Sequence, residues 1–194
     1  RREIDELENT MTGFTLHTEE SAPSASKPLL AQSQKAFGMI PRLHAVMAES
    51  PELLEAYQCI HELFVNSCFD KDELTVVWQA INVEHSCHYC VPGHTAIAKS
   101  MGVSDDISEA LRNETPLPSD RLEALRAFTV SVVRDRGNVD NDTVQIFLNA
   151  GFTRRHILEV ILGVSQKVMS NYINHLAKTP VDAPFKKFEW TKSV

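Results

Sequence analysis

Residues 71–94 read KDELTVVWQAINVEHSCHYCVPGH, and this stretch decides the fold. Asp70 stands before it as a helix N-cap, because its carboxylate can accept hydrogen bonds from the first unpaired backbone N–H groups. Apolar residues then cover nearly every side of the predicted helix: Leu74, Val76, Val77, Trp78, Ala80, Ile81 and Val83. A helix that is apolar all round is a buried helix. The sequence therefore predicts a central helix over residues 71–84, around which other helices must pack.

Two cysteines and a histidine follow this central helix at helical spacing. Cys87 and Cys90 are three residues apart, so on a helical turn their sulfurs can reach disulfide-bonding distance. His94 lies four residues after Cys90 and therefore on the same helix face. Proline is tolerated only in the first turn of a helix, so Pro92 predicts that the second helix begins near Tyr89 or the residue before it. This places Cys90 in the first turn, beside unpaired N–H groups and the positive end of the helix dipole.

The helix alone does not activate a cysteine in this position. A free cysteine titrates near ~8.5, and lowering that pKa by about 2 requires about 2.7 kcal/mol in favour of the thiolate. A helix N-terminus supplies about 0.3–1 kcal/mol, and up to about 2 kcal/mol in a partly buried site. His94 is placed to supply the difference, by accepting the thiol proton or by pairing with the thiolate. Glu84 and Glu73 are eleven residues apart on one stripe of the central helix, and either could orient His94.

The remainder of the chain carries the sequence signals of helix starts and ends. It has only 7 glycines and no Asn-Gly or Asp-Gly hairpin signal. Helix starts are predicted at caps and first-turn prolines: Pro28, Pro41, Ser50-Pro51, Ser104, Ser119 or Asp120, Asp140 or Asn141, and Thr153. We therefore predict an irregular segment over residues 1–26, followed by one all-α domain over residues 27–190. This domain is a bundle of about eight or nine helices with the Cys-x-x-Cys pair at a helix N-terminus.

The overall composition excludes several classes of protein. The chain has 194 residues, a formal net charge of −7 and no basic run, so nucleic acid would be repelled. No apolar run is long enough to span a bilayer, and residues 1–11 lack the apolar core of a signal peptide. We therefore expect a cytoplasmic protein without a nucleic-acid or membrane partner. Thiols in the cytosol are kept reduced, so a close cysteine pair indicates redox chemistry or metal binding rather than a structural disulfide.

The motif and its flanking segments resemble one family of helical proteins. Cys87-x-x-Cys90-x-x-x-His94 after a buried helix is similar to the motif of the alkylhydroperoxidase D-like proteins, of the carboxymuconolactone decarboxylase-like superfamily. The segment ESAPSASKPLLAQSQKAFGMIPRLHAVMAESPELLEAY resembles the N-terminal part of its peroxidase-related branch, and SNYINHLAKTPVD resembles its last helix. The likeness extends from Gly13 to Trp190.

The resemblance implies an all-helical fold that forms homo-oligomers, and a thiol-dependent peroxidase without an organic cofactor. Cys90 would attack the peroxide O–O bond, Cys87 would resolve the sulfenic acid as a disulfide, and His94 would belong to the proton relay. The best-known members carry a relay glutamate at the position of Thr75, so the resemblance does not supply that carboxylate. The branch with a glutamate three residues before the first cysteine fits better, and that residue is Glu84.

The residues alone leave other possibilities open. Both cysteines of the motif and His94 could bind zinc, with a fourth ligand from the set nearby: His85, His88 or Glu84. Structural zinc sites usually draw a second ligand pair from a separate segment, and no second Cys-x-x-Cys occurs. The same thiols could also act as a redox sensor without turnover. A polar stripe in the last predicted helix indicates helix packing or, as a minority possibility, a subunit interface or an active site: Asn171, Asn174 and His175.

The leading hypothesis is a cytoplasmic, homo-oligomeric thiol peroxidase. Its predicted catalytic residues are Cys90 as nucleophile, Cys87 as resolving thiol, His94 as base or relay, and Glu84 as the partner of His94. The substrate would be hydrogen peroxide or an organic hydroperoxide. Electrons would come from a dithiol protein or a small dithiol, because each cycle closes a disulfide. This hypothesis requires neither a metal nor an organic cofactor.

Overall fold

The computed structural model describes residues 13–192, and this part of the chain is all-α, as predicted. Nine α-helices follow one another within it: α2 Lys27–Phe37, α3 Arg42–Met47, α4 Pro51–Val65, α5 Lys71–Glu84, α6 Cys90–Ser100, α7 Asp105–Asn113, α8 Asp120–Arg134, α9 Asn141–Asn149 and α10 Arg154–Ala177. Two 3-10 helices flank them, η1 Ser24–Ser26 and η2 Ala183–Phe188. Residues 1–12 of the predicted irregular segment lie outside the described residues, and residues 13–23 contain no helix.

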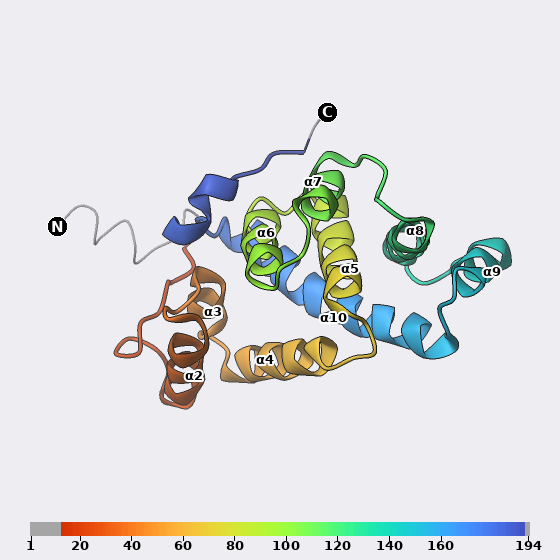
Figure 1. Cartoon of the computed structure of the whole chain (residues 1–194). Coiled ribbons are helices and arrows are strands. Elements are labelled where there is room, and N and C mark those ends of the chain that lie inside the picture. The colour runs from red at the N-terminus through yellow and green to blue at the C-terminus, as the bar shows by residue number, and fades with distance from the viewer. Residues whose placement is uncertain (1–12, 193–194) are drawn as a thin grey trace.

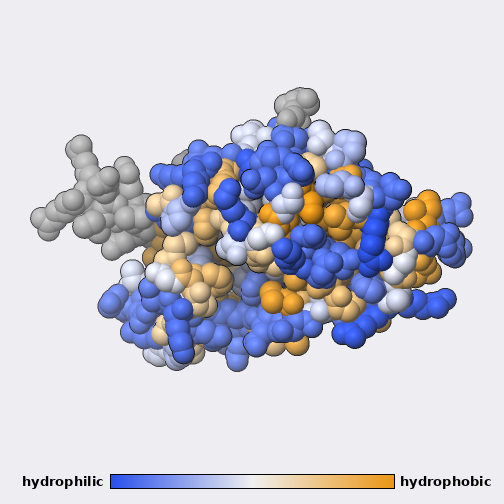
Figure 2. All heavy atoms as spheres, in the orientation of Figure 1, coloured by the Kyte–Doolittle hydropathy of each residue, from blue (hydrophilic) through white to orange (hydrophobic). Residues whose placement is uncertain are grey.

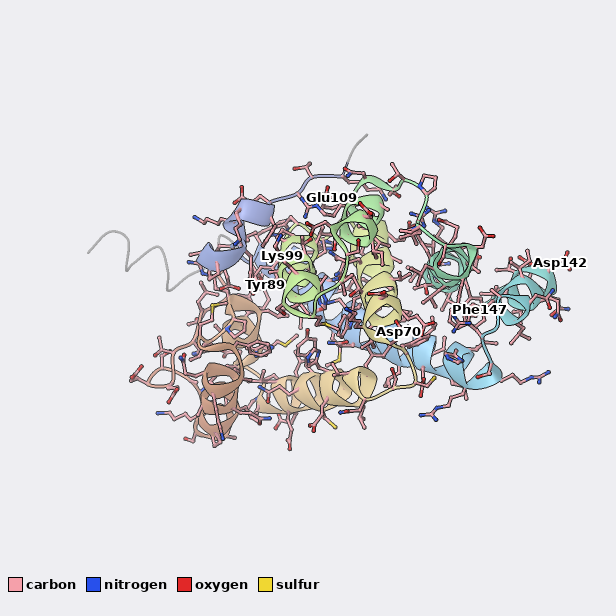
Figure 3. All side chains as sticks on the ribbon, in the orientation of Figure 1. Asp70, Tyr89, Lys99, Glu109, Asp142 and Phe147 are labelled. Carbon is pink, nitrogen blue, oxygen red and sulfur yellow. The ribbon has the colours of Figure 1, made fainter. Side chains whose placement is uncertain are left out.

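Local capping sets the helix boundaries. Asp70 accepts hydrogen bonds from the backbone N–H groups of Asp72 and Glu73, and the Glu73 side chain accepts one from the Asp70 backbone. This reciprocal capping starts α5 directly after Asp70, which Figure 3 labels at that end of the helix. Gly38 ends α2 with a φ of 71°, a left-handed conformation that glycine adopts without steric cost.

Helix α5 lies at the centre of the molecule and is buried along most of its length. Every residue from Glu73 to Val83 is buried. The helix contacts α6, α7, α8 and α10, and Figure 1 shows α10 crossing both α5 and α6. The prediction of a buried central helix over residues 71–84 is confirmed.

Helix α10 approaches α4 and α5 closely at Gly163. A β-carbon at this position would lie 2.9 Å from side-chain atoms of both Phe64 and Val77. Those two side chains are fully buried in the main apolar cluster of the molecule. The absence of a side chain at Gly163 therefore permits the close contact of the three helices.

The C-terminal segment covers the start of α6. The 3-10 helix η2 packs on α6, and Trp190 Nε1 donates to the carbonyl oxygen of Arg112 over 2.9 Å. The hydroxyl of Tyr89, labelled in Figure 3, donates to the carboxylate of Asp182 and accepts from the Leu43 N–H over 3.2 Å. Residues from both ends of the chain therefore enclose the first turn of α6.

The surface is largely polar. Figure 2 shows hydrophilic residues over most of the viewed face, with apolar patches at its centre and over α9. The patch over α9 includes Ile146, which is 62% exposed. Helix α10 carries further exposed apolar residues: Leu158, Ile161, Tyr172 and Leu176. None of the helices within residues 13–192 combines the length and the apolar character needed to cross a bilayer.

Candidate active site

A left-handed turn joins α5 to α6 and brings the two cysteines together. Ser86 has a φ of 54°, and the Cys87 N–H then donates back to the carbonyl oxygen of Asn82 in α5 over 2.9 Å. The Cys90 N–H donates to Cys87 Sγ over 3.3 Å. Both thiols are free, and the two residues are only 0% and 3% exposed. Helix α6 begins at Cys90, slightly later than predicted, so this cysteine does lie in its first turn.

The surroundings of Cys90 favour its thiolate form. Asn174 Nδ2 of α10 donates to Cys90 Sγ over 3.2 Å. Burial raises the pKa of Cys90, but the hydrogen bond from the Cys87 thiol, the charge of Lys167 and the bond from Asn174 outweigh it and lower the pKa. The pKa of Cys87 is raised by its hydrogen bond to Cys90 and by burial. Cys87 therefore stays protonated beside the thiolate of Cys90.

Lys167 of α10 is a buried cation without a carboxylate partner. Its side chain is fully buried, and its Nζ donates to His94 Nε2 over 2.9 Å. Among residues 13–192, no aspartate or glutamate forms an ion pair with it. A buried charge is unfavourable unless an opposite charge balances it, and the charge of Lys167 favours the Cys90 thiolate. The pair of Cys90 thiolate and Lys167 ammonium leaves the buried site electrically neutral.

His94 is held as a neutral imidazole with a defined tautomer. Burial, followed by the charge of Lys167, lowers the pKa of His94 well below its ordinary range. Because Lys167 donates to Nε2, that nitrogen is the acceptor and the proton lies on Nδ1. Nδ1 is buried and has no hydrogen-bond partner within the described part of the chain. His94 thus keeps an unpaired N–H donor inside the site.

A second neutral histidine, His61 of α4, is oriented by a chain of hydrogen bonds. Trp78 Nε1 donates to Gln166 Oε1 over 2.8 Å, which leaves the amide nitrogen of Gln166 to donate to His61 Nδ1, also over 2.8 Å. Burial and the charge of Lys167 lower the pKa of His61 to about 4. His61 is therefore neutral near neutral pH, with its proton on Nε2.

The site opens into a cavity of about 750 Å³. Cys90, His94, Lys167 and His61 all line it. Its other walls are mainly aromatic and aliphatic: Phe37, Met39, Pro41, Leu43, Tyr57, Val65, Ile97, Pro184 and Phe185. Pockets of about 300–1,000 Å³ with such walls are typical binding sites for small organic molecules. The cavity is therefore large enough to hold an organic molecule next to Cys90.

The structure pairs Glu84 with Arg134 rather than with His94, contrary to the sequence prediction. Arg134 Nε donates to Glu84 Oε1 over 2.7 Å, and its second nitrogen donates to Oε2 over 2.8 Å. Glu73, the other candidate, caps α5 and accepts from Arg121 Nε over 2.9 Å. The planar guanidinium of Arg134 matches both oxygens of Glu84, which holds that carboxylate in a two-point ion pair. Glu73 is held by Arg121 through Oε1 and by the Asp70 backbone N–H through Oε2.

The ligand set considered for zinc is not assembled. His85 Nδ1 bonds to Asn171 Oδ1 over 2.9 Å, and His88 Nε2 donates to the carbonyl oxygen of Thr179 over 2.9 Å. In the part of the chain that the structure describes, no group of three or more histidine, cysteine, aspartate or glutamate side chains could hold a metal ion. The neighbouring histidines of the motif therefore connect the segment between α5 and α6 to the C-terminal part of the chain.

Two residues of α10 that act on Cys90 were missed as site residues. Asn174 belongs to the polar stripe assigned mainly to helix packing, and the structure places it on the sulfur of Cys90. Lys167 lies seven residues before Asn174, so both lie on one face of the helix. Lys167 lies four and seven residues before Asn171 and Asn174, and this helical spacing could have identified it from the sequence.

Solved structures share the architecture of this chain. The alkylhydroperoxidase AhpD core from Ralstonia eutropha, an uncharacterized peroxidase-related protein, superimposes with a TM-score of 0.79 and 17% identity, over 89% of this chain and 93% of that one. A peroxidase-related protein from a Silicibacter species gives 0.77 and 18%, over 92% and 94%. The debrominase Bmp8 in complex with 2,3,4-tribromopyrrole gives 0.76 and 14%, over 92% and 97%.

The likeness is one of structure rather than of sequence. No protein-family model matches the sequence, and no curated protein matches it. The superpositions nevertheless cover about nine-tenths of this chain and of each related structure. The chain therefore has the alkylhydroperoxidase D-like fold, which peroxidase-related proteins and a debrominase share.

Proposed function

We propose that this protein reduces hydroperoxides with the Cys87–Cys90 pair. The observation that carries the proposal is the state of Cys90, a cysteine whose thiolate is favoured and which lines a cavity of organic-ligand size. The thiolate is the nucleophilic form of cysteine, and the thiol of Cys87 lies within hydrogen-bonding reach of Cys90. The fold supports the proposal, because uncharacterized peroxidase-related proteins share it.

The reaction has two steps at the cysteine pair. The Cys90 thiolate attacks the O–O bond, becomes a sulfenic acid and releases an alcohol, or water from hydrogen peroxide. The Cys87 thiol then condenses with the sulfenic acid, forming the Cys87–Cys90 disulfide and releasing water. A dithiol protein or small dithiol returns two electrons and reopens the disulfide.

Turnover with a defined dithiol tests the proposal. The protein is supplied with dithiothreitol and cumene hydroperoxide, and peroxide consumption is followed for wild type and for Cys90→Ser. We expect consumption to fall to the uncatalysed background in Cys90→Ser, because serine has no nucleophilic thiolate to offer. Cys59→Ser is the matched control, since Cys59 is an exposed cysteine outside the cavity. Unchanged consumption by Cys90→Ser would remove the peroxidase assignment.

Removal of halogen from a small aromatic molecule is a second candidate function. The cavity favours it, because aromatic walls surround the reactive thiol and the debrominase of the same fold was solved with 2,3,4-tribromopyrrole. The cysteine pair could supply two electrons and two protons, converting a carbon–bromine bond to carbon–hydrogen and bromide while it closes to a disulfide. Bromide release from 2,3,4-tribromopyrrole that depends on Cys90 would support this function, and its absence would exclude this substrate.

We also infer that copies of the chain associate. Leu158 and Leu176 of α10 are 70% and 65% exposed, and Ile161 and Tyr172 lie between them along the helix. A line of exposed large apolar residues on a long helix is typical of a protein–protein contact. A homo-oligomer would bury this surface.

A further inference from the structure

The two cysteines of the pair differ in their access to the cavity. Cys90 lines the cavity of about 750 Å³, whereas Cys87 is not one of its lining residues. Cys87 is 0% exposed and lies in a buried apolar cluster with side chains of α2, α3 and α4, among them Leu30, Met47 and Leu54. A small molecule in the cavity therefore meets Cys90 and not Cys87.

The segment that follows α10 covers the two residues between the cysteines. His88 Nε2 donates to the carbonyl oxygen of Thr179 over 2.9 Å, and the Tyr89 hydroxyl donates to the carboxylate of Asp182. A second hollow of about 330 Å³ lies beside this segment. Its lining residues include neither cysteine: His88, Val181, Glu189, Trp190 and Thr191. Within residues 13–192, this hollow therefore gives no access to the cysteine pair.

We propose that the reductant of the Cys87–Cys90 disulfide enters the same cavity as the hydroperoxide and attacks the sulfur of Cys90. The proposal rests on the hydroperoxide function proposed above and deepens it by naming the entrance and the size class of the second substrate. That substrate is a compact organic dithiol, because both of its thiols must act inside the cavity. A dithiol fixed on the surface of a folded protein does not reach Cys90.

Access and leaving-group chemistry favour different sulfurs of the disulfide. A disulfide is cleaved faster when the released thiol has the lower pKa. The pKa of Cys90 is lowered and that of Cys87 is raised, so the leaving group alone would favour attack on Cys87 and release of Cys90. Attack also requires access to the sulfur. Because Cys87 has no exposed surface, it would react only after local opening of the structure, so access favours Cys90.

The reduction balances in electrons and protons. One thiolate of the dithiol bonds to the sulfur of Cys90, the S–S bond breaks, and its electron pair stays on Cys87, which takes up a proton and becomes a thiol. The second thiol of the reductant loses its proton to water and attacks the reductant's own sulfur in the mixed disulfide. This attack releases Cys90 as a thiolate. The dithiol becomes a cyclic disulfide, having given two electrons to the cysteine pair, one proton to Cys87 and one to water.

A shared cavity makes the two substrates exclude each other. The alcohol formed from cumene hydroperoxide has the shape of that substrate but no O–O bond, so it can occupy the space beside Cys90 without reacting. At the concentration of this alcohol that halves the rate of Cys90 oxidation, we expect the rate of disulfide reduction by dithiothreitol to fall roughly twofold as well. Stopped-flow measurements of the two half-reactions provide both rates.

The attacked sulfur is identified with a monothiol. The disulfide is prepared with diamide, a small thiol oxidant, so that this test does not depend on hydroperoxide chemistry. An excess of 2-mercaptoethanol, which has no second thiol to release Cys90, is added, and the exchange is stopped with acid at the earliest times. Fragment mass spectra of the peptide then locate the added thiol. We expect it on Cys90, and a mixed disulfide on Cys87 would overturn the proposal.

A large side chain in the cavity wall tests the shared entrance. Ala36 of α2 lines the cavity and is exposed, so Ala36→Trp narrows the entrance without disturbing the core. We expect oxidation by cumene hydroperoxide and reduction by dithiothreitol to slow by a similar factor. Ala31→Trp is the matched control, because Ala31 is exposed on the same helix and does not line the cavity. Both of its rates should equal those of wild type.

The outcomes separate this entrance from the function on which it rests. If the alcohol and Ala36→Trp slow oxidation but leave reduction unchanged, the reductant enters elsewhere and the proposal is wrong, while the hydroperoxide function stands. If cumene hydroperoxide does not oxidise wild-type Cys90, the hydroperoxide function fails, and the shared entrance fails with it. Reduction by the protein dithiol thioredoxin that is faster than by dithiothreitol would also overturn the proposal. Equal slowing of both half-reactions, with the added thiol on Cys90, supports it.

Discussion

At the scale of single residues, the partner of His94 is a lysine, where the sequence analysis predicted a carboxylate. The resemblance predicted a glutamate beside the Cys-x-x-Cys-x-x-x-His motif, and the structure instead places the ammonium of Lys167 on His94. The lysine lies 73 residues from His94 in sequence, so no local pattern could connect them. The motif of Cys87, Cys90 and His94 could be recognised because these residues lie close together in sequence. Their distant partners could not.

The first residue-scale prediction concerns the pH dependence of Cys90. Its pKa is lowered in the folded protein, so the thiolate is present above that pKa and is lost as the pH falls through it. Lys167→Met removes a cation that favours this anion while the hydrogen bonds from Cys87 and Asn174 remain, so the pKa of Cys90 should rise. The alkylation rate by iodoacetamide at neutral pH should then fall by up to roughly 30-fold, the fall expected if the pKa returned to its ordinary ~8.5, and its rise should move toward alkaline pH. A pH profile identical to wild type would contradict the charge pairing.

A second residue-scale prediction concerns Glu84. Because Glu84 forms its hydrogen bonds with Arg134, Glu84→Gln should leave the rate of Cys90 oxidation within about twofold of wild type. The ion pair is partly exposed, so the free energy of unfolding should fall by no more than about 1 kcal/mol. Stopped-flow oxidation and urea unfolding check the two effects. A tenfold slower oxidation would return Glu84 to the site.

At the scale of elements, the sequence predicts the helices but not the turn between α5 and α6. Asp70 and Pro92 set where α5 and α6 begin, because capping and the missing proline N–H are local effects. The left-handed residue Ser86 is not a glycine, so nothing in the sequence indicated that the chain reverses there. That turn nevertheless determines how Cys87 returns to the end of α5.

Gly163→Ala tests the contact of α10 with α4 and α5. In an open helix this change would stabilise the protein by about 1 kcal/mol, because alanine favours the helix. At Gly163 a β-carbon meets Phe64 and Val77 at 2.9 Å, so we expect a loss of about 1–3 kcal/mol in the free energy of unfolding. Urea unfolding measures it, with Gln145→Ala at an exposed position of α9 as control. A gain in stability from Gly163→Ala would show that the helices do not pack this closely.

At the scale of the whole molecule, the all-α architecture follows from the sequence, and the cavity does not. Few glycines, no hairpin signals and successive caps are sufficient to predict a helical bundle. The cavity is lined from α2 to α4, from α6, from α10 and from the segment after α10. Its walls depend on how these elements pack, which local patterns do not specify.

The exposed apolar face of α10 predicts a homo-oligomer. Sedimentation velocity should give a mass above that of one chain, and Leu158→Glu combined with Leu176→Glu should shift it toward the monomer by placing charges in the contact. Leu63→Glu, on α4, is the control, since Leu63 is similarly exposed at 56%. A wild-type monomer at all concentrations would contradict the association.

The central claim is that Cys90 is the nucleophile and Cys87 its resolving partner. Mass spectrometry after one equivalent of cumene hydroperoxide tests it most directly. We predict a Cys87–Cys90 disulfide in wild type and, in Cys87→Ser, a single added oxygen on Cys90. Oxidation of Cys59 or Cys68 with Cys90 left as a free thiol would contradict the account.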